Sequence, residues 1–98
     1  MNNQQILLGS LSQDLFRIAN FIQSGSIKSA ERFWHETKRW TADLKNENNP
    51  AYINRILFEL DKMNFNPTSL EQGEKILTYG VITQSFAVHG FNKDINEK

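Results

Sequence analysis

Two histidines are the side chains of this 98-residue chain best suited to acid–base or metal chemistry. His35 follows Glu31 by four positions, a spacing that places both side chains on one face of a helix. A zinc site needs further ligands, and neither a Glu-x-x-His nor a His-x-x-x-His pattern occurs. We therefore expect Glu31 and His35 to form an exposed pair, and His89 to lie in a last helical turn, where the helix dipole favours a cation.

We predict no catalytic residue, no metal ligand and no cofactor, and we expect that the protein is not an enzyme. A metal-binding or hydrolytic helical bundle that uses Glu31 and His35 is kept as an alternative.

A row of basic residues is the second candidate for chemistry. Its members are spaced four, three and four residues apart and would line one helix ridge: Lys28, Arg32, His35 and Arg39. Such a ridge could track phosphates, but acidic residues interrupt it, and the whole chain carries eleven basic and eleven acidic side chains. The sequence therefore argues against nucleic acid as a partner. A nucleic-acid-associated regulator is the alternative function, with Lys28, Arg32 and Arg39 as weak polyanion candidates.

Apolar residues that recur three and four positions apart predict helices as the elements that carry these side chains. The expected helices cover about residues 3–24, 27–47, 50–64 and 69–89, and residues 92–98 form a polar tail. Gly25 is expected to end the first helix, and Thr68 with Glu71 matches a capping box. Trp34 falls in the apolar stripe of the second helix and is expected in the core.

Four amphipathic helices with short connections predict an all-α, antiparallel up-and-down four-helix bundle, and a chain of this length suffices for one domain, residues 1–98. Three shorter helices around one long helix are the structural alternative. A strand over residues 78–88 is a further alternative, because β-branched and aromatic residues are frequent there, but no second strand is available to pair with it.

Cysteine is absent, which excludes disulfides and thiolate zinc sites. The longest uncharged stretch, residues 76–92, is shorter than the roughly 20 residues that span a bilayer. We expect a cytoplasmic protein without a membrane partner.

The helix over residues 69–89 has apolar residues on two faces. One seam consists of Leu70, Leu77, Val81, Gln84 and Val88, and we assign it to the core. A second seam, formed by Tyr79, Ile82, Phe86 and His89, points roughly the opposite way. A helix that is apolar on both sides is normally buried on both sides. The second seam is therefore either an interface or the centre of the monomer core, with this helix wrapped by the other three.

The surplus apolar surface predicts a small helical protein–protein interaction module, acting as an adaptor, regulator or assembly factor. Its expected partner is a second copy, bound through the helix over residues 69–89, and/or an unidentified protein. Phe58 and Phe16 also point away from their helix seams. The predicted interface set is Tyr79, Ile82, Phe86, His89, Phe58 and Phe16.

Overall fold

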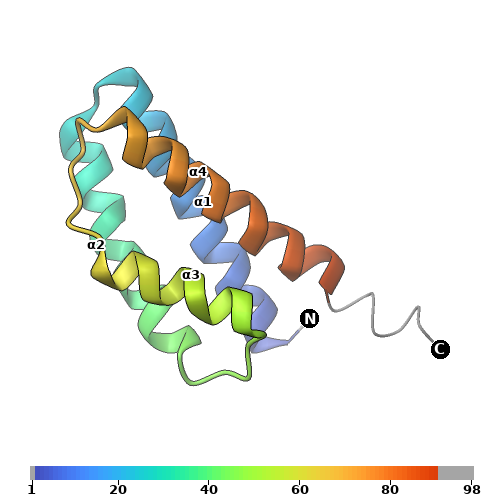
Figure 1. The fold of residues 1–98 in the computed structure, drawn as a ribbon. Helices are drawn as coiled ribbons and strands as arrows, with labels where there is room; N and C mark the ends of the chain where they lie inside the picture. Colours follow the sequence, from blue (N-terminus) through green and yellow to red (C-terminus); the bar gives the residue numbers. More distant parts are fainter. Residues whose placement is uncertain (1, 91–98) are drawn as a thin grey trace.

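The structure, a computed structural model, describes residues 2–90 and contains four α-helices and no strand within that range (Figure 1). The helices are α1 (Asn3–Ser24), α2 (Ile27–Leu44), α3 (Ala51–Lys62) and α4 (Leu70–Ser85), and a π-helical turn, η1 (Phe86–Gly90), continues α4. The predicted all-α class is confirmed, and the strand alternative is wrong because residues 78–88 are helical. The predicted polar tail lies outside the described residues.

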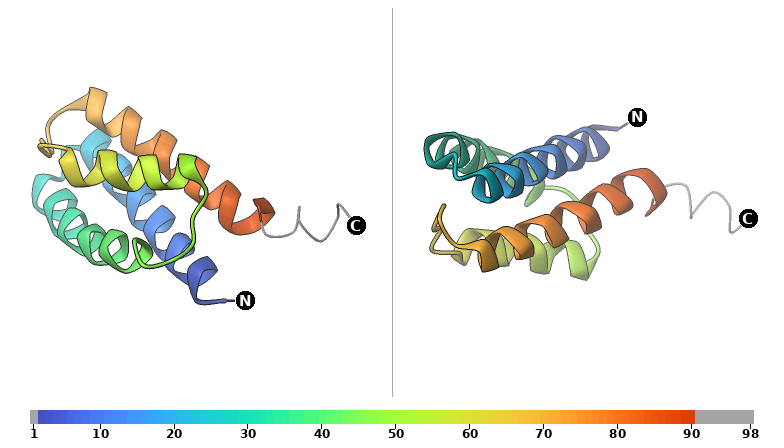
Figure 2. Two further views of the ribbon diagram at one scale, coloured as in Figure 1. Left: turned by 60° about the horizontal axis from the view of Figure 1, so that its bottom comes forward. Right: turned by 90° about the horizontal axis from the view of Figure 1, so that it is seen from above.

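The helices lie in two layers, with α1 and α2 in one layer and α3 and α4 in the other (Figure 2). α1 is packed along α2 and along α4, whereas α3 approaches α2 over only a short stretch. α3 still contributes buried side chains to the common core, namely Ile53, Ile56, Leu57 and Leu60. One hydrophobic core therefore joins all four helices.

The apolar seam of α1 forms the centre of this core. Its members, three and four residues apart, are all buried: Leu8, Leu11, Leu15, Ile18 and Ile22. Trp34 of α2 is 7% exposed, which confirms its predicted place in the core. Its ring stacks on Phe65 with a centroid distance of 4.5 Å.

Local side-chain contacts explain where the helices begin and end. Gly25 adopts a left-handed conformation (φ 78°) and ends α1 as predicted. The expected capping box at Thr68 is wrong by one position. Ser69 is the N-cap of α4, and its hydroxyl accepts a hydrogen bond from the Gln72 amide at 3.1 Å.

The face of α4 that was assigned to the core is instead its most exposed face. Leu70, Leu77, Val81 and Val88 are 60%, 46%, 52% and 50% exposed. The buried positions of α4 are Gly73, Ile76, Gly80 and Thr83. The glycines explain the difference, because they let the two backbones approach closely.

The contacts at Gly80 show how tight the α1–α4 packing is. A Cβ atom at this position would lie 3.0 Å from the Cε1 atom of Phe16. Phe16, expected to point away from the core, is therefore packed between α1 and α4. α4 thus approaches α1 closely at Gly73 and Gly80, with Ile76 buried between them along the helix, whereas Leu70, Leu77 and Val81 point outward.

Alanine substitutions at two helical glycines should separate close packing from helix propensity. Gly9→Ala, where an added Cβ meets no atom within 4 Å, is expected to raise the free energy of unfolding by about 0.5–1 kcal/mol. Gly80→Ala gains the same helix propensity but presses on Phe16, and crowding of this kind costs about 1–3 kcal/mol. Urea unfolding of both variants measures the difference, and equal stabilisation by the two would contradict the packing described here.

Candidate functional site

A groove runs between α3 and α4. It consists of three hollows in series, with volumes of about 370, 370 and 330 Å³ from η1 toward the end of α3. Tyr52 and Ile82 line both the first and the second hollow, and Glu59 and Tyr79 line both the second and the third. The shared walls make the three hollows one continuous groove.

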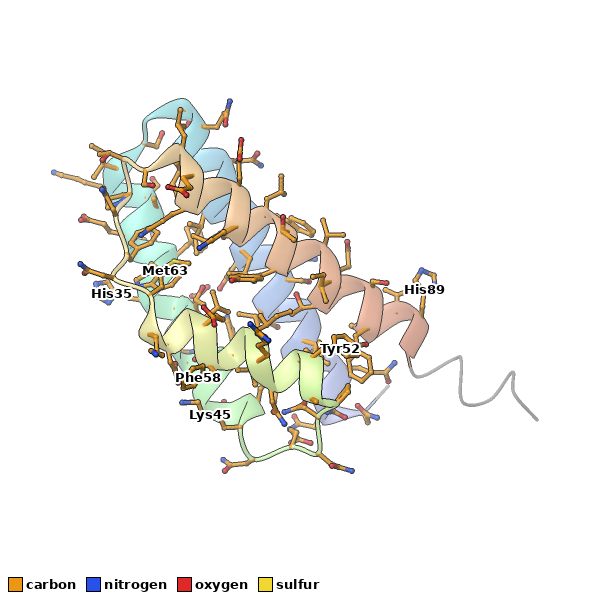
Figure 3. All side chains as sticks on the ribbon, viewed as in Figure 1. His35, Lys45, Tyr52, Phe58, Met63 and His89 are labelled. Carbon is orange, nitrogen blue, oxygen red and sulfur yellow. The ribbon has the colours of Figure 1, made fainter. Side chains whose placement is uncertain are left out.

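Aromatic contacts shape the end of the groove beside η1. The rings of Tyr52 and Phe86 meet edge to face, with their centroids 5.9 Å apart. Figure 3 shows Tyr52 at the start of α3 and His89 at the end of α4, both at the same end of the molecule. The first hollow lies between them and is lined by both residues.

Four of the six predicted interface residues come together in this groove. Tyr79, Ile82 and Phe86 are half-buried and packed against the core, and His89 is exposed in η1. All four line the hollows. Whether they contact another chain stays a prediction.

The two remaining members of the predicted set lie elsewhere. Phe58 is 55% exposed, on the edge of α3 away from α4, and the Lys62 ammonium lies 4.8 Å from its ring centroid (Figure 3). Phe16 is half-buried and lies against Gly80 at the α1–α4 contact.

The sequence analysis missed the α3 wall of the groove. Tyr52 and Ile56 are four residues apart and face the Tyr79–Ile82 side of α4 across the second hollow. Their spacing was the available signal, but nothing in the sequence identified which helix lies opposite.

A second surface runs along the outside of α4. We call Leu70, Leu77, Val81 and Val88 the outer seam. Beside it, α1 presents small or uncharged residues: Ile6, Gly9, Ser10 and Gln13 near Val88, and Ala19, Asn20 and Gln23 near Leu77. Glu74 is the one charged residue lining these two shallow hollows.

Asp14 is an acidic side chain buried between α1 and α2, and the sequence analysis did not single it out. The residue is 2% exposed. Its carboxylate accepts hydrogen bonds from Trp40 Nε1 at 2.8 Å and from Arg17 at 3.2 Å. Burial, followed by the neighbouring Glu36 carboxyl group, raises the pKa of Asp14 to about 6, and the contacts with Trp40 and Arg17 oppose this shift.

The predicted chemistry on α2 is not assembled into a site. His35 is exposed, and within residues 2–90 it forms no ion pair with Glu31, contrary to the expected pairing. In the described part of the chain, no three His, Cys, Asp or Glu side chains lie close enough together to hold a metal ion. None of the helices described here combines the length and the hydrophobicity that a bilayer crossing requires.

Two members of the basic row on α2, Arg32 and Arg39, lie near aromatic rings of the same helix. The Arg32 guanidinium is 5.9 Å from the centroid of Phe33, and the Arg39 guanidinium is 5.6 Å from that of Trp40. These contacts hold the cations against the protein surface rather than converging them on one anion.

We therefore predict no dedicated phosphate site at Lys28, Arg32 and Arg39. In a gel-shift assay at low salt, the wild type and Arg32→Glu should both bind single-stranded nucleic acid weakly and equally. Tight binding that weakens steeply with salt and disappears in Arg32→Glu would contradict this prediction, because phosphate contacts release counterions.

The chain matches no protein-family model, no curated protein and no solved structure, so its function has to be argued from its own surfaces.

Proposed function

We propose that the protein is a small helical interaction module that forms a homodimer through the outer seam of α4. The observation that carries this proposal is the exposure of Leu70, Leu77, Val81 and Val88 along one side of α4 and of its continuation η1. Large exposed apolar residues that gather on one face typically mark an interaction site. Homodimers with two-fold symmetry are the commonest oligomers, so a second copy is the proposed occupant.

The spacing of the outer seam suits helix–helix pairing. Its positions alternate four and three residues apart when Glu74 and Gln84 are included: Leu70, Glu74, Leu77, Val81, Gln84 and Val88. This is the spacing of a coiled-coil seam, in which each side chain fits between side chains of the facing helix.

The two polar positions indicate an antiparallel pairing. In a parallel dimer Glu74 would face Glu74 of the other copy, and like charges opposite each other repel. In an antiparallel dimer with its two-fold axis between Leu77 and Val81, Glu74 faces Gln84 of the other copy. The same axis sets Leu77 against Val81 and Leu70 against Val88, so apolar residues meet apolar residues throughout.

The surroundings of the seam support the same assignment. Residues 76–90 contain no Asp, Glu, Lys or Arg, and the α1 residues that flank the seam are uncharged. Depletion of charge is typical of interface cores.

The regular up-and-down bundle predicted from the sequence is part of this proposal. The packing of α1 against both α2 and α4 supports it, whereas the backbone of α3 approaches α2 over only a short stretch and approaches α4 even less.

The contact is tested by placing charge on the seam. Leu77→Glu combined with Val81→Glu should leave the protein helical by circular dichroism and shift its mass from dimer to monomer by light scattering at tens of micromolar. Phe58→Glu is the matched control, because Phe58 is equally exposed but lies on α3, away from the seam. A wild-type monomer under these conditions would contradict the proposal.

The antiparallel register is tested by changing Gln84 alone. Gln84→Lys would form two Glu–Lys pairs in the antiparallel dimer, and Gln84→Glu would set two carboxylates against each other. At about 0.5 kcal/mol per pair, the dimer dissociation constant should fall about fivefold for the first variant and rise about as much for the second. The reverse order of affinities would indicate parallel helices.

A further inference from the structure

We propose that the groove between α3 and α4 binds an amphipathic helix of a different protein, and that this helix carries acidic residues beside its apolar stripe. The groove lies on the α3 side of α4, next to the outer seam but lined mainly by other residues. The proposal therefore does not depend on the homodimer.

The shape of the groove favours an elongated partner. Each of its three hollows falls within the range of about 300–1,000 Å³ that is usual for ligand pockets, but they lie in series rather than forming one enclosed cavity. A helix docks in such a groove by inserting side chains from successive turns. Tyr52, Ile56 and Ile82 form the apolar walls that would receive these anchors.

The charged residues along the groove indicate which charges the partner helix carries beside its apolar stripe. Three cations, Arg55, Lys62 and Lys75, line the second and third hollows, against one anion, Glu59. The groove thus has a net positive charge, although the whole chain has none. Glu74, also on α4, lines the shallow hollow on the α1 side instead.

The ion pairs formed within residues 2–90 involve none of these three cations. The contact shown for the Lys62 ammonium is with the ring of Phe58. Complementary charge at the rim of an interface speeds association and selects the partner. An acidic flank would meet Lys62 and Lys75 while the apolar stripe fills the end beside Tyr52 and Phe86.

Selection from a displayed peptide library tests both features of the partner. The library consists of helices of about 18 residues, five turns, with apolar residues on one stripe and flanks randomised among Glu, Lys and Ser. Against the full-length protein, the enriched peptides should carry more Glu than Lys. The best of them, labelled with a fluorophore, should bind the wild type at least about tenfold more tightly than Tyr52→Glu.

Substitutions test whether peptide binding depends on the groove or on another part of the surface. Lys62→Glu combined with Lys75→Glu should reverse the preference from Glu-flanked to Lys-flanked peptides, whereas Ile27→Ala, an exposed position at the start of α2, should leave binding unchanged. Circular dichroism checks that each variant is folded, and Tyr52 is half exposed, so its replacement should be tolerated.

The proposal would be overturned by no enrichment on the wild type over Tyr52→Glu, by enrichment without a charge preference, or by equal loss of binding in Ile27→Ala. If Tyr52→Glu instead converts a dimer into a monomer, the groove is filled by a second copy and the proposal is also wrong. If Leu77→Glu, a substitution outside the groove, is monomeric and still binds the peptide, the dimer contact and the groove act independently. A wild type that is monomeric but binds the peptide would contradict the homodimer and leave the groove proposal standing.

Discussion

Replacing Trp34 with alanine is expected to lower the free energy of unfolding by about 3–5 kcal/mol, the usual cost of removing a large aromatic side chain from a core. Trp34 is 7% exposed, its ring is stacked on Phe65, and the Lys38 ammonium lies 4.7 Å from its centroid. The residue therefore joins α2 to the segment between α3 and α4. Small domains are stable by only about 5–15 kcal/mol, so this substitution should remove a large fraction of the total.

Urea or thermal unfolding measures this effect, with Phe58→Ala as the matched control. Phe58 is also aromatic but is 55% exposed, so its removal should change stability by less than about 0.5 kcal/mol. If Trp34→Ala unfolded at the same urea concentration as the wild type, the packing of α2 against Phe65 would be wrong.

The second large effect is expected from the protonation of Asp14. Its pKa is raised from 3.8 to about 6 in the folded protein, so between these values the folded chain holds a proton that the unfolded chain has released. The unfolded state then binds fewer protons, and the free energy of unfolding falls as the pH rises. The contribution of Asp14 is fully present below about pH 4 and is lost as the pH passes through about 6, a total of about 3 kcal/mol.

Comparison with Asp14→Asn isolates this contribution from that of other carboxyl groups. The amide oxygen of asparagine can still accept the hydrogen bond from Trp40 but does not titrate. The stability of the wild type relative to Asp14→Asn should therefore decrease by about 2 kcal/mol between pH 4 and pH 7, which is most of the total change. Asp43→Asn, at an exposed position on α2, is the matched control for the exchange of an aspartate for an asparagine.

Glu36→Gln tests the cause of the shift. The Glu36 carboxyl group raises the pKa of Asp14, so its neutralisation should lower that pKa and narrow the pH range over which stability changes. A constant difference between the wild type and Asp14→Asn from pH 4 to pH 7 would show that Asp14 is not buried as described.

The spacing of apolar residues was sufficient to predict the helices of this protein. The seam from Leu8 to Ile22 alternates three and four residues apart and is buried along its whole length, and Gly25 ends α1 in the left-handed conformation. These features depend on local geometry: the helix period, the conformational freedom of glycine and the side chain at the helix start.

The orientation of α4 was decided only by the tertiary structure. The sequence analysis assigned Leu77, Val81 and Val88 to the core because they are large and apolar, yet these residues are exposed, and the buried face of α4 consists of Gly73, Ile76, Gly80 and Thr83. Periodicity identifies an apolar stripe but does not say whether large residues or a close backbone approach will bury more surface. That choice depends on the shape of the facing helix, here the positions of Phe16 and Ile22 on α1.

The groove and the buried carboxyl group of Asp14 also depend on the tertiary structure. Tyr52 and Phe86 are 34 positions apart and become neighbours only when α3 lies beside α4. Asp14 falls among the apolar residues of α1, but its pKa depends on Glu36 and Trp40 of α2. The sequence by itself determined which segments are helical and which of their faces are apolar. Which of these faces are covered was decided by side-chain shapes on neighbouring helices, because burial depends on contacts between residues that are distant along the chain.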